Sequence, residues 1–467
     1  MAEDRGQFSS KLGFILAAAG SAVGLGNLVA FPVMASKNGG AAFLIIYLFC
    51  IAFVCYPVMM AEIAMGRRSQ RNPVGAFTEI SGGMKRWRLV GMLGILTPFM
   101  IAVFYTVITV WLVVYLKEIS TGGLGMLAED SAFGEIVARP SLFYYLALLL
   151  VVVFIILLGG VKGGIERLAK ILMPTLAVML LLLTVFVLTL DGASAGISYY
   201  LVPDFSKVTL TVVNGAVSHA FFSLSLGMGI LITYGSYFSK EDSIPQSTRM
   251  VAMADTSIAF FAGLLILPAI FAFDPNTNTD DLSTSSVGLI FSFLPKIFLS
   301  MQAAVGYTGA SVAALAFFTL VFFAALTSLV SIVEIPISCW IDEWKFSRRK
   351  AVLFQAVLLA VFAIPATMSL GISDFFTNFT FYGGVSKSFF DLVSDVFYST
   401  ILPLVGFTVC IFSAYQWKVS GLSAELSIGD DNFEGSRLQK YMNFSLGTVI
   451  PAVLLIVFIS TVYQIYL

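Results

Sequence analysis

Four polar residues lie deep inside long apolar stretches of the chain, and they point to a buried transport site. Asn27, Ser223, Ser225 and Asp255 are each flanked on both sides by hydrophobic runs. Within a bilayer an ionisable group is costly and usually functional, so Asp255 predicts a site on a path across the membrane. The alternative is a structural role, in which Asp255 pairs with a helix backbone.

Two glycine-rich interruptions accompany these polar residues. They cover residues 20–27 and 223–229, each near the middle of an apolar run. Backbone that leaves a helix inside a membrane is tolerated only where it lines a cavity enclosed by protein. One such cluster could simply allow close helix packing. Two clusters at corresponding positions predict paired broken helices, which build a midplane site from helix ends and freed carbonyls.

The elements that position these residues are membrane-spanning helices. The 467 residues are 58% hydrophobic and 11% charged, with a mean hydropathy of +0.94, which excludes a water-soluble globular protein. About 20 apolar residues cross a bilayer. We count eleven such segments: 12–36, 41–65, 89–116, 141–158, 168–190, 213–238, 251–273, 306–340, 351–370, 389–416 and 442–467. The first is long and broken by glycine, unlike a signal peptide, so we expect it to be retained.

The interruptions lie in segments 1 and 6, five segments apart, which is typical of two inverted five-helix repeats. We predict an all-α integral membrane protein with eleven transmembrane helices, of which helices 1 and 6 are broken. The first repeat would occupy residues 1–190, and the inverted second repeat residues 191–416. Residues 417–467 would form a cytoplasmic loop and segment 11.

The positive charges predict the orientation in the membrane, because cytoplasmic loops keep an excess of Lys and Arg. With the N-terminus inside, 20 of the 26 Lys and Arg residues fall on the cytoplasmic side. The odd number of segments then places the C-terminus outside. Loop 274–281 would also be external.

Several classes of function are excluded by the composition and by missing motifs. A net charge of −1 gives no reason to expect nucleic acid as a partner. The four cysteines lie in apolar runs without metal-ligand spacing. The sequence has no Walker motif and no Ser/His/Asp set, so we expect neither an ATP-driven transporter nor an enzyme.

Five groups of residues closely resemble the neurotransmitter:sodium symporters. They are residues 11–27 with Phe31-Pro32 and 38–40; Pro57, Glu62 and Gly66; Tyr105 and Trp111; residues 222–234; and residues 324–328. The resemblance covers essentially the whole chain. Animal members usually have twelve segments and cysteines in the second external loop. This chain has eleven and no cysteine between positions 117 and 141, so it is similar to a prokaryotic member of the cytoplasmic membrane.

The resemblance implies two sodium sites, and carbonyls freed in broken helices suit a hard cation. The first would use the Ala22 carbonyl, Asn27, Ser223, Asp255 and the carboxylate of the bound substrate. The second would use the carbonyls of Gly20, Val23 and Ala324 with the hydroxyls of Thr327 and Ser328. Many relatives have an uncharged Asn in place of Asp255 and balance the sodium with chloride. We therefore expect transport to be independent of chloride.

The resemblance also implies how an amino acid would bind. Its carboxylate would face the half-helix N-terminus at Leu25 and Gly26 and the hydroxyl of Tyr105. The positions that would face the amine are Ala22, Phe222 and Ser225. Monoamine carriers of the family have an aspartate at the position of Gly24. The absence of that aspartate from this chain favours amino acids as substrates.

The matching side-chain pocket contains no charged residue. It would be lined by Ile101, Tyr105, Phe222, Ser225, Met228, Ser328 and Ile332. Met228 replaces a ring found in relatives, and methionine adapts to differently shaped neighbours. We therefore expect hydrophobic substrates, both aliphatic and aromatic.

The outer gate departs from the family pattern. Relatives pair an arginine with the aspartate matched by Asp395, but this chain has Ala30 in place of the arginine and His219 in place of a neighbouring glutamine. One hypothesis is that His219 and Asp395 close the mouth in a pH-dependent way. The alternative is a neutral structural histidine.

At the inner mouth, Arg5 and Asp342 match the family's gate, with Tyr237 beside them. Arg5 could instead be an ordinary positive-inside anchor. Glu62, at a position that braces segment 6, and Glu334 are interpreted as structural acids.

The sequence therefore predicts a sodium-coupled symporter that imports neutral, hydrophobic L-amino acids by alternating access. One rival is a transport-deficient amino-acid sensor that uses the same site. A second is a sodium-leak channel, which the occluding rings of Tyr105 and Phe222 disfavour. The oligomeric state is left open.

Overall fold

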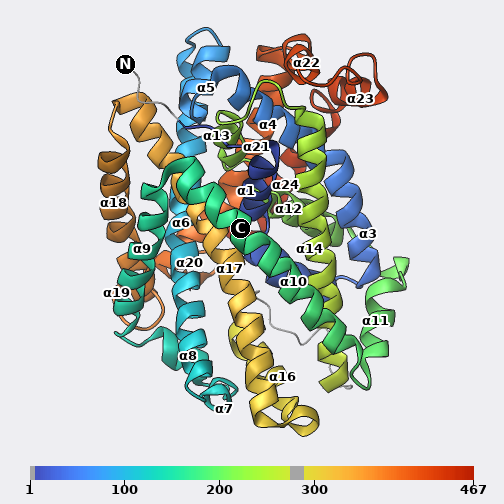
Figure 1. The fold of residues 1–467 in the computed structure, drawn as a ribbon, viewed down its shortest axis with the longest axis vertical. Coiled ribbons are helices and arrows are strands. Elements are labelled where there is room, and N and C mark those ends of the chain that lie inside the picture. The colour runs from blue at the N-terminus through green and yellow to red at the C-terminus, as the bar shows by residue number, and fades with distance from the viewer. Residues whose placement is uncertain (1–5, 274–288) are drawn as a thin grey trace.

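The structure is a computed structural model, and it describes residues 6–273 and 289–467. It is a bundle of helices, most of which run between the two ends of the molecule (Figure 1). Eight helices in the described residues are long and apolar enough to cross a membrane, and one bent pair adds a ninth. The apolar helix α9 (Leu142–Leu158) and the interrupted pair α12 and α13 complete eleven segments, which confirms the predicted count.

Several segments contain π-helical turns between their α-helical parts. Apart from segments 1 and 6, the spans in chain order are α3 (Ala41–Cys50), η2 (Ile51–Cys55) and α4 (Tyr56–Ser69); α6 (Lys85–Ser120); α9; η3 (Val161–Glu166) and α10 (Arg167–Leu188); α14 (Ile244–Phe273); α17 (Gln302–Trp344), which is kinked at Gly306; α18 (Arg348–Met368); α20 (Phe389–Val393), η7 (Ser394–Ile401), α21 (Leu402–Ile411) and η8 (Phe412–Gln416); and α24 (Val449–Tyr466).

The first segment is broken where the sequence predicts. α1 (Lys11–Ala22) ends at Val23, whose extended backbone (φ −71°, ψ 103°) leaves the helix. The chain continues through η1 (Gly26–Ala30) into α2 (Phe31–Lys37), and the two halves are bent by 50°. Carbonyls at the end of α1 therefore have no helical partner and are free to bind other groups.

The sixth segment is also broken as predicted. α12 (Leu210–Ser223) and α13 (Ile230–Gly235) are separated by a non-helical stretch. Gly227 and Gly229 have φ of +73° and +68°, values that glycine adopts without steric cost. Ser225 also has a positive φ, of 56°. The glycines allow the chain to turn sharply within the bundle.

The connecting elements gather at the two ends of the molecule. Figure 1 shows α5, α22 and α23 at one end and α7, α8 and α16 at the other. Their bounds, with those of the other connections, are α5 (Pro73–Ile80), α7 (Leu124–Leu127), α8 (Ala132–Val137), α11 (Ala193–Leu201), η4 (Phe205–Lys207), η6 (Leu289–Phe293), α16 (Leu294–Ser300), α19 (Asp374–Thr377), the antiparallel strands β1 (Thr380–Tyr382) and β2 (Val385–Lys387), α22 (Val419–Ser427) and α23 (Arg437–Ser445).

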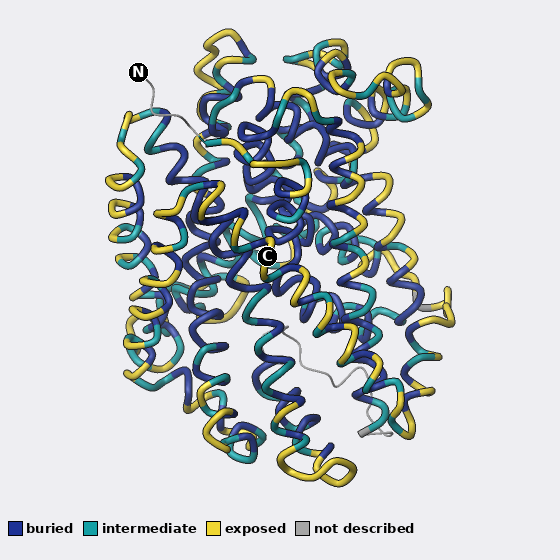
Figure 2. Tube along the Cα trace, in the orientation of Figure 1, coloured by how far each residue is buried: buried dark blue, intermediate teal, exposed yellow. Residues whose placement is uncertain are grey.

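Burial separates central helices from peripheral ones. In the most apolar stretch of α6, 89% of residues are buried within the protein, against 28% in the η3–α10 span and 22% in α24. Figure 2 shows the same contrast between the interior of the bundle and its outer helices. Exposed apolar faces on the outer helices are expected where a protein meets lipid.

The ends of several segments lie beyond the predicted limits. α6 begins at Lys85 and α17 ends at Trp344, because charged helical turns outside the hydrocarbon region carry no hydropathy signal. The span predicted from residue 168 begins at Val161, in a π-helical turn that contains Lys162 and Glu166. The hairpin of β1 and β2 was not predicted. Loop 274–281 lies outside the described residues.

Candidate functional site

The polar residues of the two broken helices converge on the carboxylate of Asp255, which is fully buried on α14. The side-chain amide of Asn27 donates to Asp255 Oδ1 over 2.7 Å and to the Asp255 backbone carbonyl over 3.1 Å. The hydroxyl of Ser223 lies 3.1 Å from both carboxylate oxygens. Segments 1, 6 and 7 therefore meet at one group of oxygen atoms.

Sequence reasoning missed a fourth member of this cluster, Tyr47 on α3. Its hydroxyl lies 3.3 Å from Asp255 Oδ2 and 3.2 Å from the hydroxyl of Ser223. Tyr47 is fully buried. The available signal was a hydroxyl within the apolar run of segment 2, but Tyr is common in such runs and carries little information alone.

The Asp255 carboxylate has only neutral partners among the described residues. Its hydrogen bonds come from the amide of Asn27 and the hydroxyls of Ser223 and Tyr47, and no Lys, Arg or His pairs with it. A buried carboxylate without a counter-charge is expensive. The arrangement therefore fits a hard cation, which prefers oxygen ligands and supplies the missing positive charge.

A second group of oxygen atoms lies where α1 meets α17. The Ser328 hydroxyl is within 3.4 Å of the carbonyl of Gly20 and 3.2 Å of that of Val23. It also contacts the carbonyl of Ser21, at 3.0 Å. On the same helix, the hydroxyl of the preceding residue, Thr327, donates to the Ala324 carbonyl over 3.0 Å. The structure thus brings together Gly20, Val23 and Ser328, three of the five residues expected at the second ion site, and adds Ser21.

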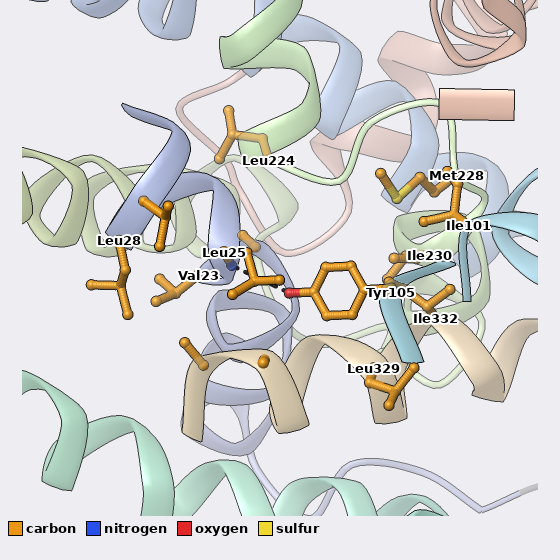
Figure 3. Close-up of a cluster of buried hydrophobic side chains, with 14 of the residues drawn as sticks. Val23, Leu25, Leu28, Ile101, Tyr105, Leu224, Met228, Ile230, Leu329 and Ile332 are labelled. Atoms are coloured by element: carbon orange, nitrogen blue, oxygen red, sulfur yellow. Dashed lines mark hydrogen bonds between the residues drawn. The ribbon is translucent and has the colours of Figure 1, made fainter. Parts of the chain in front are cut away.

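Tyr105 of α6 lies beside the break in helix 1. Its hydroxyl accepts a hydrogen bond from the backbone N–H of Leu25, 3.2 Å away, and Figure 3 shows it directed at the break in helix 1. Ile101, Met228 and Ile332 gather around the other end of the ring, each at most 3% exposed. Three of the residues predicted to line the side-chain pocket therefore form a buried apolar cluster against the ring of Tyr105.

Small residues bring the two breaks into direct contact. A Cβ on Gly24 would lie 2.7 Å from the Ser328 hydroxyl and 2.8 Å from that of Tyr105, so any side chain there meets both. A Cβ on Gly26 would lie 3.2 Å from the ring of Phe222. The Ser225 hydroxyl donates to the carbonyl of Ser21 over 3.2 Å, which links the two breaks.

Two of the buried acids outside the ion sites, Glu62 and Glu334, hold structural elements. Glu62 on α4 accepts a hydrogen bond of 2.8 Å from the backbone N–H of Gly227, in the break of segment 6. Glu334 on α17 forms an ion pair of 2.7 Å with Arg348 and accepts a hydrogen bond of 3.1 Å from the hydroxyl of Tyr237. The bracing position expected for Glu62 matches this contact.

At the predicted inner gate, Asp342 of α17 accepts hydrogen bonds from the backbone and side chain of Asn72, at 2.8 and 2.9 Å. Phe8 lies next to Tyr237, since its N–H donates to the Tyr237 carbonyl over 3.3 Å. Arg5, the predicted partner of Asp342, lies outside the described residues. The structure therefore describes one side of this gate.

His219 and Asp395 are not in contact in the structure, and the hypothesis that they close the outer mouth stays a prediction beside the alternative of a structural histidine. His219 is 5% exposed, and its ring packs beside those of Phe31 and Tyr47 at 5.8 and 5.7 Å. Asp395 is instead bound from the β1–β2 hairpin. Aromatic packing holds the histidine within the bundle, away from that carboxylate.

These features define a membrane transporter whose two broken helices enclose paired oxygen-rich sites, and comparisons with known proteins agree. The model of the sodium:neurotransmitter symporter family matches residues 5–128 and 133–466. The chain belongs to this family, which consists of transporters and not of enzymes.

Several relatives match over nearly the full length. The uncharacterized sodium-dependent transporter YhdH of Bacillus subtilis is 30% identical, over 98% of this chain and 97% of its own. A sodium-dependent serotonin transporter of Drosophila melanogaster is 26% identical, over 79% of this chain and 65% of its own. The crystal structure of MhsT in complex with L-phenylalanine is similar with a TM-score of 0.84 and 38% identity, covering 98% of this chain and all of that one.

Proposed function

We propose that this protein imports neutral, hydrophobic L-amino acids together with Na⁺ and without chloride. The observation that carries the proposal is the Asp255 carboxylate, which is fully buried and, within residues 6–273 and 289–467, bound only by neutral groups. It supplies a fixed negative charge next to the break of helix 1, where family members bind sodium. A sodium ion therefore finds its counter-charge in the protein, and an added anion is unnecessary.

Two sodium ions are proposed, one at each group of oxygen atoms. The first would be bound by the Ala22 carbonyl, Asn27, Ser223, Asp255 and the substrate carboxylate. The second would be bound by the carbonyls of Gly20, Val23 and Ala324 and the hydroxyls of Thr327 and Ser328. Support comes from the contacts of Asn27 and Ser223 with Asp255, and of the Gly20 and Val23 carbonyls with the Ser328 hydroxyl. Sharing the first ion with the substrate would couple the two fluxes.

The substrate would lie between the two breaks. Its carboxylate would meet the N–H groups of Leu25 and Gly26 and the Tyr105 hydroxyl, which already lies 3.2 Å from the Leu25 nitrogen. Its amine would face Ala22, Phe222 and Ser225. Gly24 leaves no space for the aspartate of monoamine carriers, because a Cβ there would lie 2.7 Å from Ser328 Oγ. This favours substrates that bring their own carboxylate.

The side chain of the substrate would enter the apolar pocket around Ile101, Met228 and Ile332. MhsT, whose structure was solved with L-phenylalanine, is 38% identical to this chain. The pocket residues are uncharged and buried. We therefore propose that phenylalanine and aliphatic amino acids such as leucine are both accepted.

Transport by alternating access would use the two inverted repeats, residues 1–190 and 191–416. A ligand shifts a conformational equilibrium only by binding its states differently, so sodium would favour the outward-open state and full loading would permit closure. We propose a prokaryotic cytoplasmic membrane, with the N-terminus inside and the C-terminus outside. Asp342, Tyr237 and Arg5 would form the inner gate.

Reconstitution in liposomes tests the proposal. Uptake of labelled phenylalanine and leucine would be measured with sodium outside, with equimolar potassium outside, and with chloride replaced by gluconate. Concentrative uptake that requires sodium and ignores the gluconate exchange is the expected result. Sodium-dependent binding without uptake would instead identify an amino-acid sensor, and sodium flux without saturable uptake would identify a channel.

A further inference from the structure

The central site is covered by a column of aromatic rings. The ring of Tyr398, on η7, stands edge-on against that of Phe222, with centroids 4.4 Å apart. The Phe222 ring in turn packs on Gly26, where a Cβ would lie 3.2 Å from it. Contact therefore runs from segment 10, through Phe222, to the break of helix 1. The position of η7 therefore sets where the Tyr398 ring lies against Phe222.

A single carboxylate fixes η7 from the side of the connecting hairpin. Asp395 lies three residues before Tyr398, in the first turn of η7. Its Oδ2 accepts a hydrogen bond of 2.8 Å from the hydroxyl of Tyr382 and lies 3.2 Å from the ammonium nitrogen of Lys387. The side chains of Lys387 and Asp395 are 25% and 19% exposed. This pair is thus more shielded from water than an ordinary surface ion pair.

The hairpin holds Lys387 in a fixed place. β1 and β2 pair antiparallel, with Thr380 opposite Lys387. The Lys387 carbonyl accepts from the N–H of Phe379 over 2.9 Å. The next residue, Ser388, caps α20 in a reciprocal capping box with Asp391. The backbone on both sides of Lys387 is therefore restrained.

Tyr382 joins the hairpin to the last helix as well. Its ring lies 5.2 Å from that of Tyr466, whose hydroxyl is 3.1 Å from the side-chain oxygen of Thr400 in η7. Burial and the nearby Asp395 carboxylate raise the pKa of Tyr382. The phenol therefore keeps its proton and remains a donor to Asp395 at physiological pH.

We propose that Lys387 is a positioning residue for transport, which binds Asp395 and so holds Tyr398 over Phe222 in the closed state of the site. Relatives have an arginine at the position of Ala30 on segment 1. In this chain Lys387, on the hairpin, would supply that positive charge instead. Opening of the site toward the β1–β2 hairpin would then break the contact between Lys387 and Asp395 and free η7 to move. The identity of the retained substrate rests on the proposed function, whereas the contact between Lys387 and Asp395 does not.

The first test measures retention of bound substrate. Purified protein would be loaded with labelled phenylalanine in sodium, and the dissociation rate measured after dilution. Lys387→Gln and Asp395→Asn should each release phenylalanine about fivefold faster, as expected for loss of a partly shielded ion pair. Lys387→Arg should restore slow release. Lys117→Gln is the matched control, because Lys117 forms a surface ion pair of 3.1 Å with its neighbour Glu118.

A charge swap separates pairing from general damage. The double variant Lys387→Asp with Asp395→Lys restores opposite charges and should recover slow release, whereas either single reversal should not. In uptake assays, loss of positioning should change the maximal rate more than the KM. Unchanged release in Lys387→Gln, or no recovery in the double variant, would overturn the proposal.

The second test needs no substrate. Spin labels on Val385→Cys in the hairpin and Leu210→Cys at the start of α12 would report the distance between these exposed sites. The four native cysteines are buried and are left in place. Lys387→Gln should broaden a narrow distance distribution, and Lys117→Gln should not. If the wild type binds no amino acid, the proposed function fails while this measurement still decides the pairing.

Discussion

The hydroxyl of Ser328 lies 3.0 Å from the carbonyl oxygen of Ser21, across the contact between α17 and α1. Two further carbonyls, of Gly20 and Val23, lie within 3.4 Å of the same hydroxyl. A hydroxyl can donate only one proton at a time. Three carbonyl oxygens thus face a hydroxyl that can donate to one of them at a time. A bound cation would satisfy the remaining carbonyl oxygens.

Replacing Ser328 by alanine should therefore weaken sodium binding. The Ser328→Ala variant would lack one ligand of the proposed second sodium site, and we expect the sodium concentration for half-maximal uptake to rise about tenfold, equivalent to about 1.4 kcal/mol. Sodium-dependent thermal stabilisation of the purified protein measures the same loss. Ser338→Ala is the control, since that hydroxyl donates to the Ile335 carbonyl of its own helix. Equal sodium responses in both variants would contradict the assignment.

Asp255→Asn should couple the protein to chloride. The substitution keeps the shape of the side chain but removes the buried negative charge, so sodium affinity should fall about a hundredfold in gluconate. Chloride should recover part of the loss by supplying the missing charge. Uptake against sodium concentration, measured in chloride and in gluconate, gives the result. A chloride-insensitive Asp255→Asn variant with normal sodium affinity would show that the carboxylate has only a structural role.

Two glycines of the first broken helix should differ in their tolerance of alanine. A Cβ at position 24 would lie within 2.8 Å of the hydroxyls of Ser328 and Tyr105, whereas one at position 20 would meet the flexible Met173 side chain at 3.3 Å. Gly24→Ala should therefore abolish amino-acid uptake at normal expression, and Gly20→Ala should retain most of it. Uptake per milligram of purified protein tests the difference. Equal activity would mean that the breaks are not packed as described.

The contact between Glu62 and Gly227 should support the break of segment 6. Glu62→Ala leaves the Gly227 N–H without an acceptor, which costs about 1–3 kcal/mol for a buried donor. We expect a lower melting temperature in detergent, together with slower uptake. Glu62→Gln keeps a side-chain oxygen and should resemble the wild type. If Glu62→Gln were as damaging as Glu62→Ala, the charge of Glu62 rather than its hydrogen bond would be essential.

The packing of His219 favours a structural role for this residue over a pH-dependent outer gate. Its ring packs with Phe31 and Tyr47, and it forms no ion pair among the described residues. We expect sodium-driven uptake to vary little between about pH 5.5 and 8.5, where an ordinary histidine changes charge. Initial rates in wild type and His219→Gln measure this. A steep profile that is lost in His219→Gln would restore the gating hypothesis.

The sequence predicts the central features of the fold because membrane helices follow local rules. Apolar length set the eleven segments, and the glycine clusters at 20–27 and 223–229 located both breaks. The ends of the helices were less accurate, because charged turns such as that at Lys85 continue α6 without any apolar signal. Family membership and the all-helical fold are confirmed, while the roles of the site residues remain predictions.

The contacts that sequence reasoning missed join residues distant in the chain. Tyr47 reaches Asp255 across 208 positions, and nothing in its own segment indicates that contact. Lys387 meets Asp395 only because an unpredicted hairpin turns back toward η7. Such pairs depend on how the elements pack in three dimensions, which local hydropathy and spacing do not encode.

The two broken helices also bear on the direction of transport when the sodium gradient across the membrane collapses. Both breaks lie inside the bundle, and the same oxygen atoms and apolar pocket would serve a solute arriving from either face. A site that is accessible in turn from both faces imposes no direction on transport, so the net flow of solute follows the electrochemical gradients. If the proposed function holds, a cell whose sodium gradient collapses would therefore lose accumulated substrate through this same protein.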